Sequence, residues 1–181
     1  MQVIQTTIPD VLVIEPKVFG DDRGFFYESF NKKLLQEIAG IKDEFVQDNH
    51  SRSVKNVLRG LHYQLVQPQG KIVRVVAGEV FDVVVDLRKR SPTFGQWAGV
   101  HLSAANKKML WVPKGFAHGF LVLSDVAEFV YKTTDFYHPA SERSLRWDDP
   151  DLQIIWPIDT SPVLSAKDSQ GTCLKDAEVY A

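Results

Sequence analysis

Short runs rich in valine, isoleucine, phenylalanine and tyrosine recur along this 181-residue chain, separated by proline, glycine, asparagine and aspartate. Such runs are typical of β-strands, and many short strands favour a barrel or a sandwich. Valine outnumbers alanine 22 to 11, which suits pleated strands better than helices. The runs are residues 3–8, 11–18, 25–30, 45–51, 57–65, 71–77, 79–87, 97–102, 108–112, 118–123 and 127–134. We therefore predict a mainly β protein.

One segment has helix signals at both ends. Asn31 can cap its start and Gly40 its end. Between them, Leu34, Leu35 and Ile38 recur at helical spacing. We expect one short helix here, and a further short helical turn near residues 165–168.

The chain shows no linker, internal repeat or long block of charge, so we expect a single domain over residues 1–181 with an irregular tail after about residue 156. A chain of this length can bury about 70% of the surface that it exposes when unfolded. No apolar run approaches the ~18 residues of a membrane span, and the first residues lack the basic start and apolar stretch of a signal peptide. We expect a cytoplasmic protein without a membrane partner.

Charge and cysteine content exclude several further classes of function. A net charge of −2 provides no overall attraction for nucleic acid. Cys173 is the only cysteine, so an internal disulfide and a thiolate zinc cluster are both excluded. An anionic ligand would have to be met by a few locally placed cations.

Polar residues interrupt three predicted strands on faces that are otherwise apolar. An unpaired polar group in a dry core costs roughly 1–3 kcal/mol, so we expect these side chains to line a ligand cavity inside a barrel. The alternative is that these faces are outward and solvated. Alternation along a strand gives the shared faces as Gln47 and Asn49 with Phe45, Gly60 with His62 and Gln64, and Lys71 with Val73 and Val75.

Two of the five histidines lie in segments that resemble the signature regions of cupin barrels. His62 lies in VLRGLHYQ and His118 in WVPKGFAHGF. Cupins that bind a metal usually offer His-x-His in the first region, whereas here the pair is His62 and Gln64. Because the ligand set is incomplete, a metal-free site is the better interpretation.

Seven segments, in order over nearly the whole chain, resemble the dTDP-4-dehydrorhamnose 3,5-epimerase family. They are DDRGFFYESF (21–30), FVQDNHS (45–51), VLRGLHYQ (57–64), GKIVRVVAGEVFDVVVDLRKRSPTFGQW (70–97), LWVPKGFAHGFLVLSD (110–125), AEFVYKTTDFY (127–137) and LSAKD (164–168). The resemblance implies a cupin-type jelly-roll barrel with a few short helices and a homodimer without metal or cofactor. It also implies a dTDP-4-keto-6-deoxyhexose substrate, dTDP-4-dehydro-6-deoxy-D-glucose, on the route to dTDP-L-rhamnose.

Epimerisation at C3 and C5 beside a C4 ketone requires a base, a partner for the enolate oxygen and an acid. The resemblance implies that His62 is the base, Asp168 its partner and Tyr131 the proton donor. Lys71 can direct its cation at the oxygen on C4. The structural alternatives are a helix-capping Asp168, a core Tyr131 and a solvated Lys71 at a strand end.

The nucleoside diphosphate of such a substrate calls for cations, amides and aromatic rings. Guanidinium groups match phosphate oxygens, so Arg23 and Arg59 are the natural pair, with Lys167 as a further cation. For the aromatic candidates the alternative is a place in the core, and we favour stacking most for Tyr137. The remaining substrate-binding candidates are Gln47, Asp48, Asn49, Glu28, Glu142 and His118, and the aromatic ones are Phe19, Phe26 and Tyr137.

Three other functions remain open. Relatives of the same fold epimerise only C3 or only C5, and Met109 and Phe136 depart from the residues we expect in this family. A metal-dependent cupin oxygenase and a non-catalytic sugar-nucleotide sensor belong to different classes, although the joint presence of the four catalytic candidates argues against the sensor. In a dimer, an exchanged N-terminal strand near residues 3–8 could place residues 23–28 in a neighbouring pocket.

Overall fold

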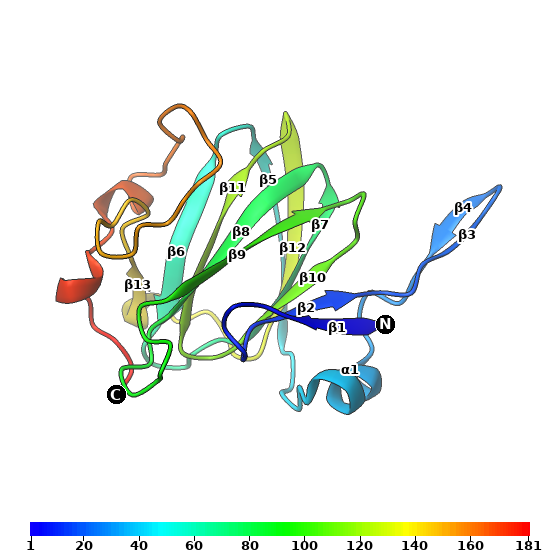
Figure 1. Cartoon of the computed structure of the whole chain (residues 1–181), viewed down its shortest axis with the longest axis horizontal. Helices are drawn as coiled ribbons and strands as arrows, with labels where there is room; N and C mark the ends of the chain where they lie inside the picture. Colours follow the sequence, from blue (N-terminus) through cyan, green and yellow to red (C-terminus); the bar gives the residue numbers. More distant parts are fainter.

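The computed structural model describes residues 1–181 and consists mainly of two antiparallel sheets packed face to face (Figure 1). The six-stranded sheet has the order β1-β2-β10-β7-β12-β5, and the five-stranded sheet the order β13-β6-β11-β8-β9. The first comprises β1 (Gln2–Gln5), β2 (Leu12–Glu15), β10 (Met109–Val112), β7 (Lys71–Ala77), β12 (Val126–Thr133) and β5 (Gln47–Val54). The second comprises β13 (Glu142–Ser144), β6 (Leu58–Gln64), β11 (Phe116–Val122), β8 (Glu79–Asp86) and β9 (Trp97–Ser103). The prediction of a mainly β, cupin-type barrel is confirmed.

The main core lies between the two sheets. Alternate residues of β7 and β8 enter it, such as Val73 and Val75 from one strand and Val80 and Val84 from the other. A second apolar layer covers the outer face of the five-stranded sheet, where Trp156 and other residues of the C-terminal segment pack. Strands β8 and β11 are therefore buried on both faces, which explains why their sequences are almost continuously apolar.

Helix α1 (Lys32–Ala39) forms where its two end signals predict it. The Asn31 side chain accepts a hydrogen bond from the Leu34 backbone N–H at 3.0 Å, and Gly40 ends the helix with a φ of 68°. Leu35 anchors the helix beside Trp111 of the six-stranded sheet. No helix in the structure is both long and apolar enough to cross a membrane.

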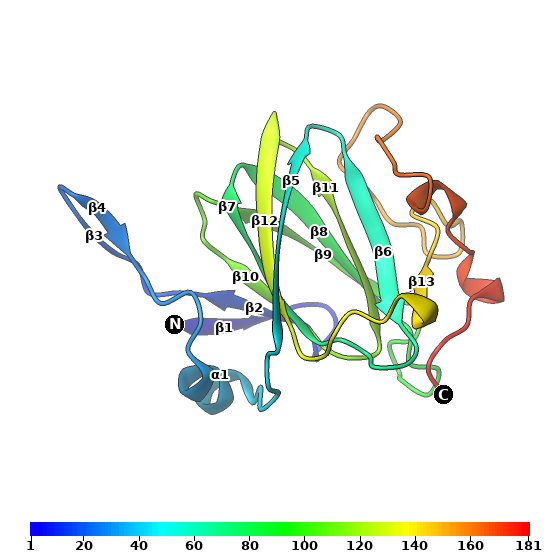
Figure 2. The same ribbon diagram turned by 180° about the vertical axis from the view of Figure 1, so that it is seen from behind.

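The N-terminal region differs from the strand pattern. The expected strand at 25–30 is instead part of a hairpin, β3 (Phe19–Asp21) and β4 (Gly24–Phe26), which forms a separate two-stranded sheet. This hairpin, which we call the arm (residues 19–26), projects away from the barrel (Figure 2). Local alternation cannot anticipate it, because the first strand, Phe19–Asp21, is too short to show a pattern and forms only by pairing with Gly24–Phe26 across the turn.

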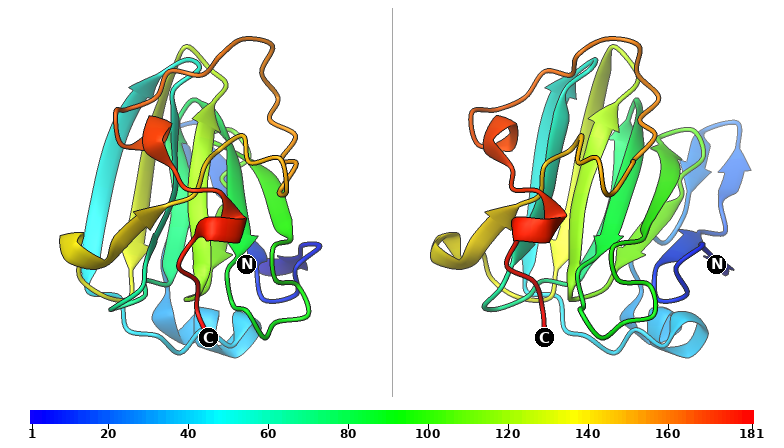
Figure 3. Two further views of the ribbon diagram at one scale, coloured as in Figure 1. Left: turned by 90° about the vertical axis from the view of Figure 1, so that its left-hand side faces the viewer. Right: turned by 60° about the vertical axis from the view of Figure 1, so that its left-hand side comes forward.

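The C-terminal segment after Trp156 contains only short 3-10 turns, Asp168–Gln170 and Leu174–Asp176, in addition to an earlier one at Pro139–Ser141. It runs over the outer side of the five-stranded sheet (Figure 3). The Tyr180 hydroxyl donates to the Gln64 carbonyl at 2.6 Å, and the Tyr63 hydroxyl donates to the Glu178 carbonyl at 2.7 Å. The tail is thereby fastened to β6.

Candidate active site

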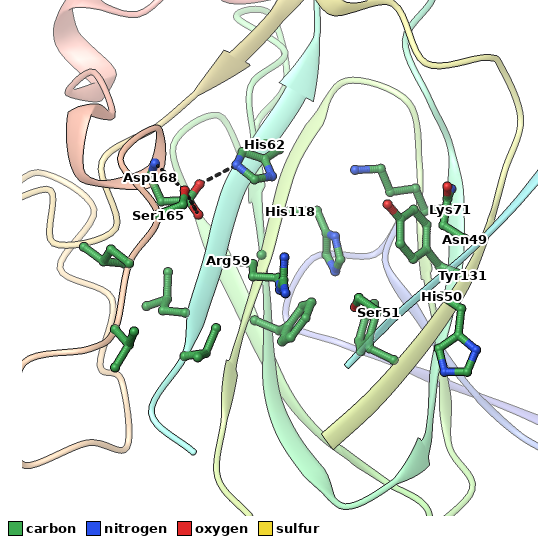
Figure 4. A pocket seen from close by; sticks show the side chains of 17 residues that line it. Asn49, His50, Ser51, Arg59, His62, Lys71, His118, Tyr131, Ser165 and Asp168 are labelled. Carbon is green, nitrogen blue, oxygen red and sulfur yellow. Dashed lines mark hydrogen bonds and ion pairs between the residues drawn. The ribbon is translucent and has the colours of Figure 1, made fainter. Parts of the chain in front are cut away.

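A cavity of about 540 Å³ opens between the two sheets (Figure 4). This volume falls within the range of small-molecule sites, roughly 300–1,000 Å³. Side chains from β5, β6, β7, β11 and β12 line it, together with the loop around residues 163–168. The polar strand residues Asn49, His62, Lys71 and His118 are all among them.

His62 and Asp168 form a hydrogen-bonded pair at one wall of the cavity. The Nε2 atom of His62 lies 2.5 Å from Oδ1 of Asp168, and the Ser165 hydroxyl donates to Oδ2 at 2.8 Å. Burial alone would raise the pKa of Asp168, but its bonds to His62 and Ser165 bring that pKa below its ordinary value. Because the carboxylate accepts the Nε2 proton, Nδ1 of His62 is the nitrogen left to take up another proton.

A bulge in β6 brings Arg59 to the same cavity as His62, although strict alternation would put the two on opposite faces. Arg59 lies opposite Phe120 and His62 opposite His118, so β6 has one extra residue in this stretch. Gly60 occupies the bulge with a φ of 115°. A Cβ atom there would lie 2.6 Å from the Cα of Gly119, so only glycine fits at this close approach.

Lys71 and Tyr131 face the cavity from the six-stranded sheet, opposite His62. Only 9% of Lys71 is exposed, and its ammonium group has no hydrogen-bond or ion-pair partner within the chain. Burial lowers the pKa of Lys71 to about 8, while the carboxylates of Asp82 and Glu142 oppose that change. Burial also raises the pKa of Tyr131, so its phenol remains protonated at neutral pH.

His118 is paired with a residue that the sequence patterns had not singled out. Its Nε2 atom lies 2.9 and 3.0 Å from the two carboxylate oxygens of Asp82. The sequence contains a signal for Asp82, since this carboxylate interrupts the apolar run VFDVVV (residues 80–85) on the face of Val80 and Val84. The hydroxyl of Ser165 was missed as well, although it lies three residues before Asp168 in a capping arrangement.

A smaller cavity of about 90 Å³ shares His62, Lys71 and Tyr131 with the first and continues toward Tyr137 and Glu142. The Tyr137 hydroxyl donates to Glu142 at 2.7 Å. Lys167 forms an ion pair with the same carboxylate. Although burial alone would raise the pKa of Glu142, its bonds to Lys167 and Tyr137 hold it below the ordinary value. Three predicted binding residues therefore meet at one place.

The predicted amide cluster is only partly directed at the cavity. Gln47 donates its amide to the side-chain oxygen of Asn49 at 2.9 Å. Asp48 faces the other side of β5 and forms an ion pair with Lys132 at 2.8 Å. Gln64 supports the loop that bears Tyr137, because its amide nitrogen donates to the Phe136 carbonyl at 3.2 Å and its oxygen accepts from the backbone of His138.

Four predicted binding residues do not reach the cavity of their own chain. Arg23 is occupied by Asp21 on the arm, and Glu28 accepts a hydrogen bond from Asn31 at 3.0 Å. Phe19 and Phe26 are largely exposed. The arm carries three of these residues, Glu28 follows it directly, and the arm points away from the barrel.

No cluster of three or more histidine, cysteine, aspartate or glutamate side chains in the structure is arranged to hold a metal ion. The family model for dTDP-4-dehydrorhamnose 3,5-epimerase matches residues 5–176. The chain belongs to this family. The resemblance of the seven sequence segments is thereby confirmed, and the chain is a carbohydrate epimerase, an isomerase.

Individual relatives span the same length. The dTDP-4-dehydrorhamnose 3,5-epimerase of Shigella flexneri is 63% identical over 182 residues, which cover 99% of each chain. A crystal structure of the Legionella pneumophila 3,5-epimerase in complex with dTDP-4-keto-L-rhamnose matches with a TM-score of 0.96 and 58% identity, covering 98% of this chain and 94% of that one. A 3'-monoepimerase of Streptomyces bikiniensis, bound to dTDP-quinovose, matches with a TM-score of 0.88 and 35% identity over 97% of this chain and 88% of that one.

Proposed function

We propose that this chain epimerises both C3 and C5 of dTDP-4-dehydro-6-deoxy-D-glucose, giving dTDP-4-dehydro-L-rhamnose, and that it needs no metal or cofactor. The observation that carries the proposal is the placement of His62 and Tyr131 on opposite sheets around one cavity. Inversion requires a proton to leave one face of the ring and another to return from the opposite face. Two groups on facing walls can do this to a sugar that stays bound between them.

In each inversion, Nδ1 of His62 takes the proton from carbon, and the electrons of the broken C–H bond move to the oxygen on C4. Asp168 stabilises the resulting imidazolium. The ammonium of Lys71 stabilises the enolate oxygen, and this contact strengthens as charge develops. Tyr131 then gives its proton to the opposite face of the carbon and regains one from solvent, while His62 releases its proton to solvent.

The remaining candidates bind the diphosphate, the sugar and the nucleoside of the substrate. Arg59 faces the cavity with its Nε bound to Ser53 at 2.9 Å, which leaves the rest of the guanidinium for the diphosphate. Asn49, with Gln47 behind it, and His118 face the sugar. Tyr137, Glu142 and Lys167 lie toward the nucleoside, and Asp48 contributes through the backbone of β5.

We also propose that two copies assemble, and that the arm delivers Arg23, Phe26 and Phe19, with Glu28 close behind, to the site of the partner. The exposure of these residues on a single chain supports this. Residues 1–181 act as one catalytic domain, since β1 and β2 extend the six-stranded sheet and the tail supplies Asp168. The cytoplasm is the proposed compartment, in accord with the single cysteine.

Proton NMR of the reaction in D2O tests the double epimerisation. We expect solvent deuterium to enter at both C3 and C5. Exchange at only one carbon would instead assign the chain to the mono-epimerases. Stoichiometric iron or nickel in the purified protein, with activity lost to a chelator, would favour the oxygenase, and binding without any exchange would favour the sensor.

Two variants test the assigned roles. His62→Ala should abolish exchange at both carbons while dTDP still binds, and retained exchange would exclude His62 as the base. Tyr131→Phe should impair proton return more than proton abstraction. Deuterium should therefore still enter the substrate from the face of His62, while product formation falls. An equal loss of substrate binding would make Tyr131 structural.

A further inference from the structure

Asp82 is a carboxylate in the interior of the barrel to which the proposed mechanism assigns no role. It lies in β8 between Val80 and Val84, on the face that forms the main core, and it is 0% exposed. An isolated buried charge costs several kcal/mol, and an apolar side chain of similar size often stabilises a fold equally well. Packing therefore gives no reason for a carboxylate at this position.

The contacts of Asp82 are directed at the active site. Both of its oxygens approach Nε2 of His118, at 2.9 and 3.0 Å, and the side chain makes no other hydrogen bond. Burial raises the pKa of Asp82, and His118 and Lys71 oppose that change. When Asp82 is ionised its oxygens only accept, so Nε2 of His118 then carries the proton of this contact. The other ring nitrogen, Nδ1, has no partner within the chain, and the His118 side chain lines the 540 Å³ cavity. Asp82 thus determines how His118 is presented to a ligand.

Asp82 also acts on Lys71 from a distance. Among the charges that surround Lys71, Asp82 contributes the largest effect that favours the ammonium form; Glu142 acts in the same direction and Lys167 against it. The other titratable groups that line the cavity with Lys71 are His50, Arg59, His62, His118, Tyr131 and Asp168. Since Lys71 has no hydrogen bond of its own, a counter-charge within the barrel favours its protonated form before substrate binds.

We propose that Asp82 is a positioning residue of this epimerase, which holds His118 with Nδ1 free for the substrate and keeps Lys71 as an ammonium ion beside the C4 oxygen. The inference rests on the proposed function, because it assumes that Lys71 stabilises the enolate. Asp82 does not touch the substrate. It prepares the side of the cavity that receives the negative charge.

The variant Asp82→Asn keeps the shape of the side chain and removes its charge. We expect kcat to fall at least tenfold at pH 8, whereas the affinity for dTDP, measured by calorimetry, stays within about threefold of the wild-type value. The alkaline limb of the kcat profile should move to lower pH, because Lys71 loses the counter-charge that favours its protonated form. In a Lys71→Arg background the cation does not titrate and the limb due to Lys71 should be absent, so the same substitution should not shift any alkaline limb that remains.

A purely structural role would lower the melting temperature of Asp82→Asn without moving the alkaline limb, and that result would overturn the proposal, as would a kcat and pH profile equal to the wild type. If Asp82→Asn does not fold, Asp82→Leu gives the same test with an apolar side chain of similar volume. Deuterium exchange by the wild type distinguishes a failure of the proposed epimerase function from a failure of the role of Asp82. If the wild type exchanges neither carbon, the proposed function fails; if it exchanges both and the variant matches it, only the role of Asp82 fails.

Discussion

Asp168 and Lys71 are both buried, but only the charge of Asp168 has hydrogen-bond partners within the chain. Only 4% of Asp168 is exposed, but the carboxylate has His62 and Ser165 as partners. Lys71 has no partner. Because Lys71 lines the cavity, an enolate oxygen there would give its ammonium a hydrogen-bond partner that the chain itself does not supply. A contact that is missing in the free protein and is completed as charge develops lowers the barrier rather than merely improving binding.

At the same scale, Asp168→Asn should leave the cavity intact and remove the charge that, in the proposed mechanism, stabilises the imidazolium of His62. We expect kcat to fall about 10²–10⁴-fold, the usual contribution of positioned acid–base catalysis, with little change in dTDP affinity. Steady-state kinetics and calorimetry measure the two effects. Asp125→Asn is the matched control, since Asp125 is exposed and its side chain makes no hydrogen bond. A kcat within threefold of the wild-type value would contradict the role of Asp168.

Among the elements, β6 does the most to assemble the site. One face carries Arg59 and His62 into the cavity, and the other holds Tyr63 under the C-terminal tail. The bulge at Gly60 makes the first arrangement possible, because it restores both polar residues to one side. The position of His62, the proposed base, therefore depends on how closely β6 approaches β11.

Gly60→Ala tests this dependence. The new Cβ would meet the backbone of Gly119 at 2.6 Å and the His118 carbonyl oxygen at 2.7 Å, and neither can move as a flexible side chain would. We expect the free energy of unfolding, measured by urea denaturation, to be lower than that of the wild type by at least about 2 kcal/mol. We also expect kcat to fall. Gly40→Ala is the control, because φ is also positive there but no atom lies within 4 Å of the new Cβ; its cost should stay near 1 kcal/mol. Equal effects of the two substitutions would show that the close approach is unimportant.

The turn from β8 to β9 depends on another buried carboxylate. Asp86 accepts hydrogen bonds from Arg88 at 2.7 Å, Ser91 at 2.6 Å and Thr93 at 2.7 Å. Burial alone would raise the pKa of Asp86, but these bonds bring it down to about 2. Since its folded pKa is below the unfolded value, Asp86 stabilises the protein above about pH 4, and this contribution is lost as the pH falls through about 2.

Asp86→Asn should therefore lower the free energy of unfolding at pH 7 by about 2 kcal/mol. The gap between variant and wild type should narrow as the pH falls from 4 to 2, because the wild type then loses the same ionic interaction. Urea denaturation at pH 7, 4, 3 and 2 measures it. A gap that is constant over this range would mean that shape, and not charge, makes Asp86 important.

How far the elements could be predicted depends on the range of the forces that form them. The strands of the two sheets and α1 follow from alternation and from caps, which are local. The three-residue strand β13 and the arm could not be predicted, because such short strands exist only through their pairing. In the site, alternation correctly placed Lys71 with Val73 and Val75 but separated Arg59 from His62, since a bulge cannot be recognised from side-chain pattern alone. The contacts of Asp82 with His118 and of Ser165 with Asp168 could be recognised only from the distances in the structure.

The whole molecule raises the question of what the arm contacts. Phe25 and Phe26 are 64% and 67% exposed, with Phe19 beside them, on a hairpin that the barrel does not cover. Exposed apolar clusters of this kind mark interaction surfaces. Arg23 stands at the tip, paired only with Asp21 of the same turn. A second copy of the chain would bury the aromatic rings and gain a cation for its anionic substrate.

Subunit complementation tests this arrangement. If arms cross, a dimer of one His62→Ala chain and one Arg23→Ala chain has one site that lacks both residues and one site that is intact. Co-expression with two different tags isolates this mixed dimer, and at substrate concentrations below KM it should show about half of the wild-type activity, well above either parent. The combination of His62→Ala with Asp168→Asn is the control. Both of those changes lie in the pocket of their own chain, so no intact site can form. A mixed dimer no more active than its parents would show that each arm serves its own chain, and a monomer in equilibrium sedimentation would refute the assembly altogether.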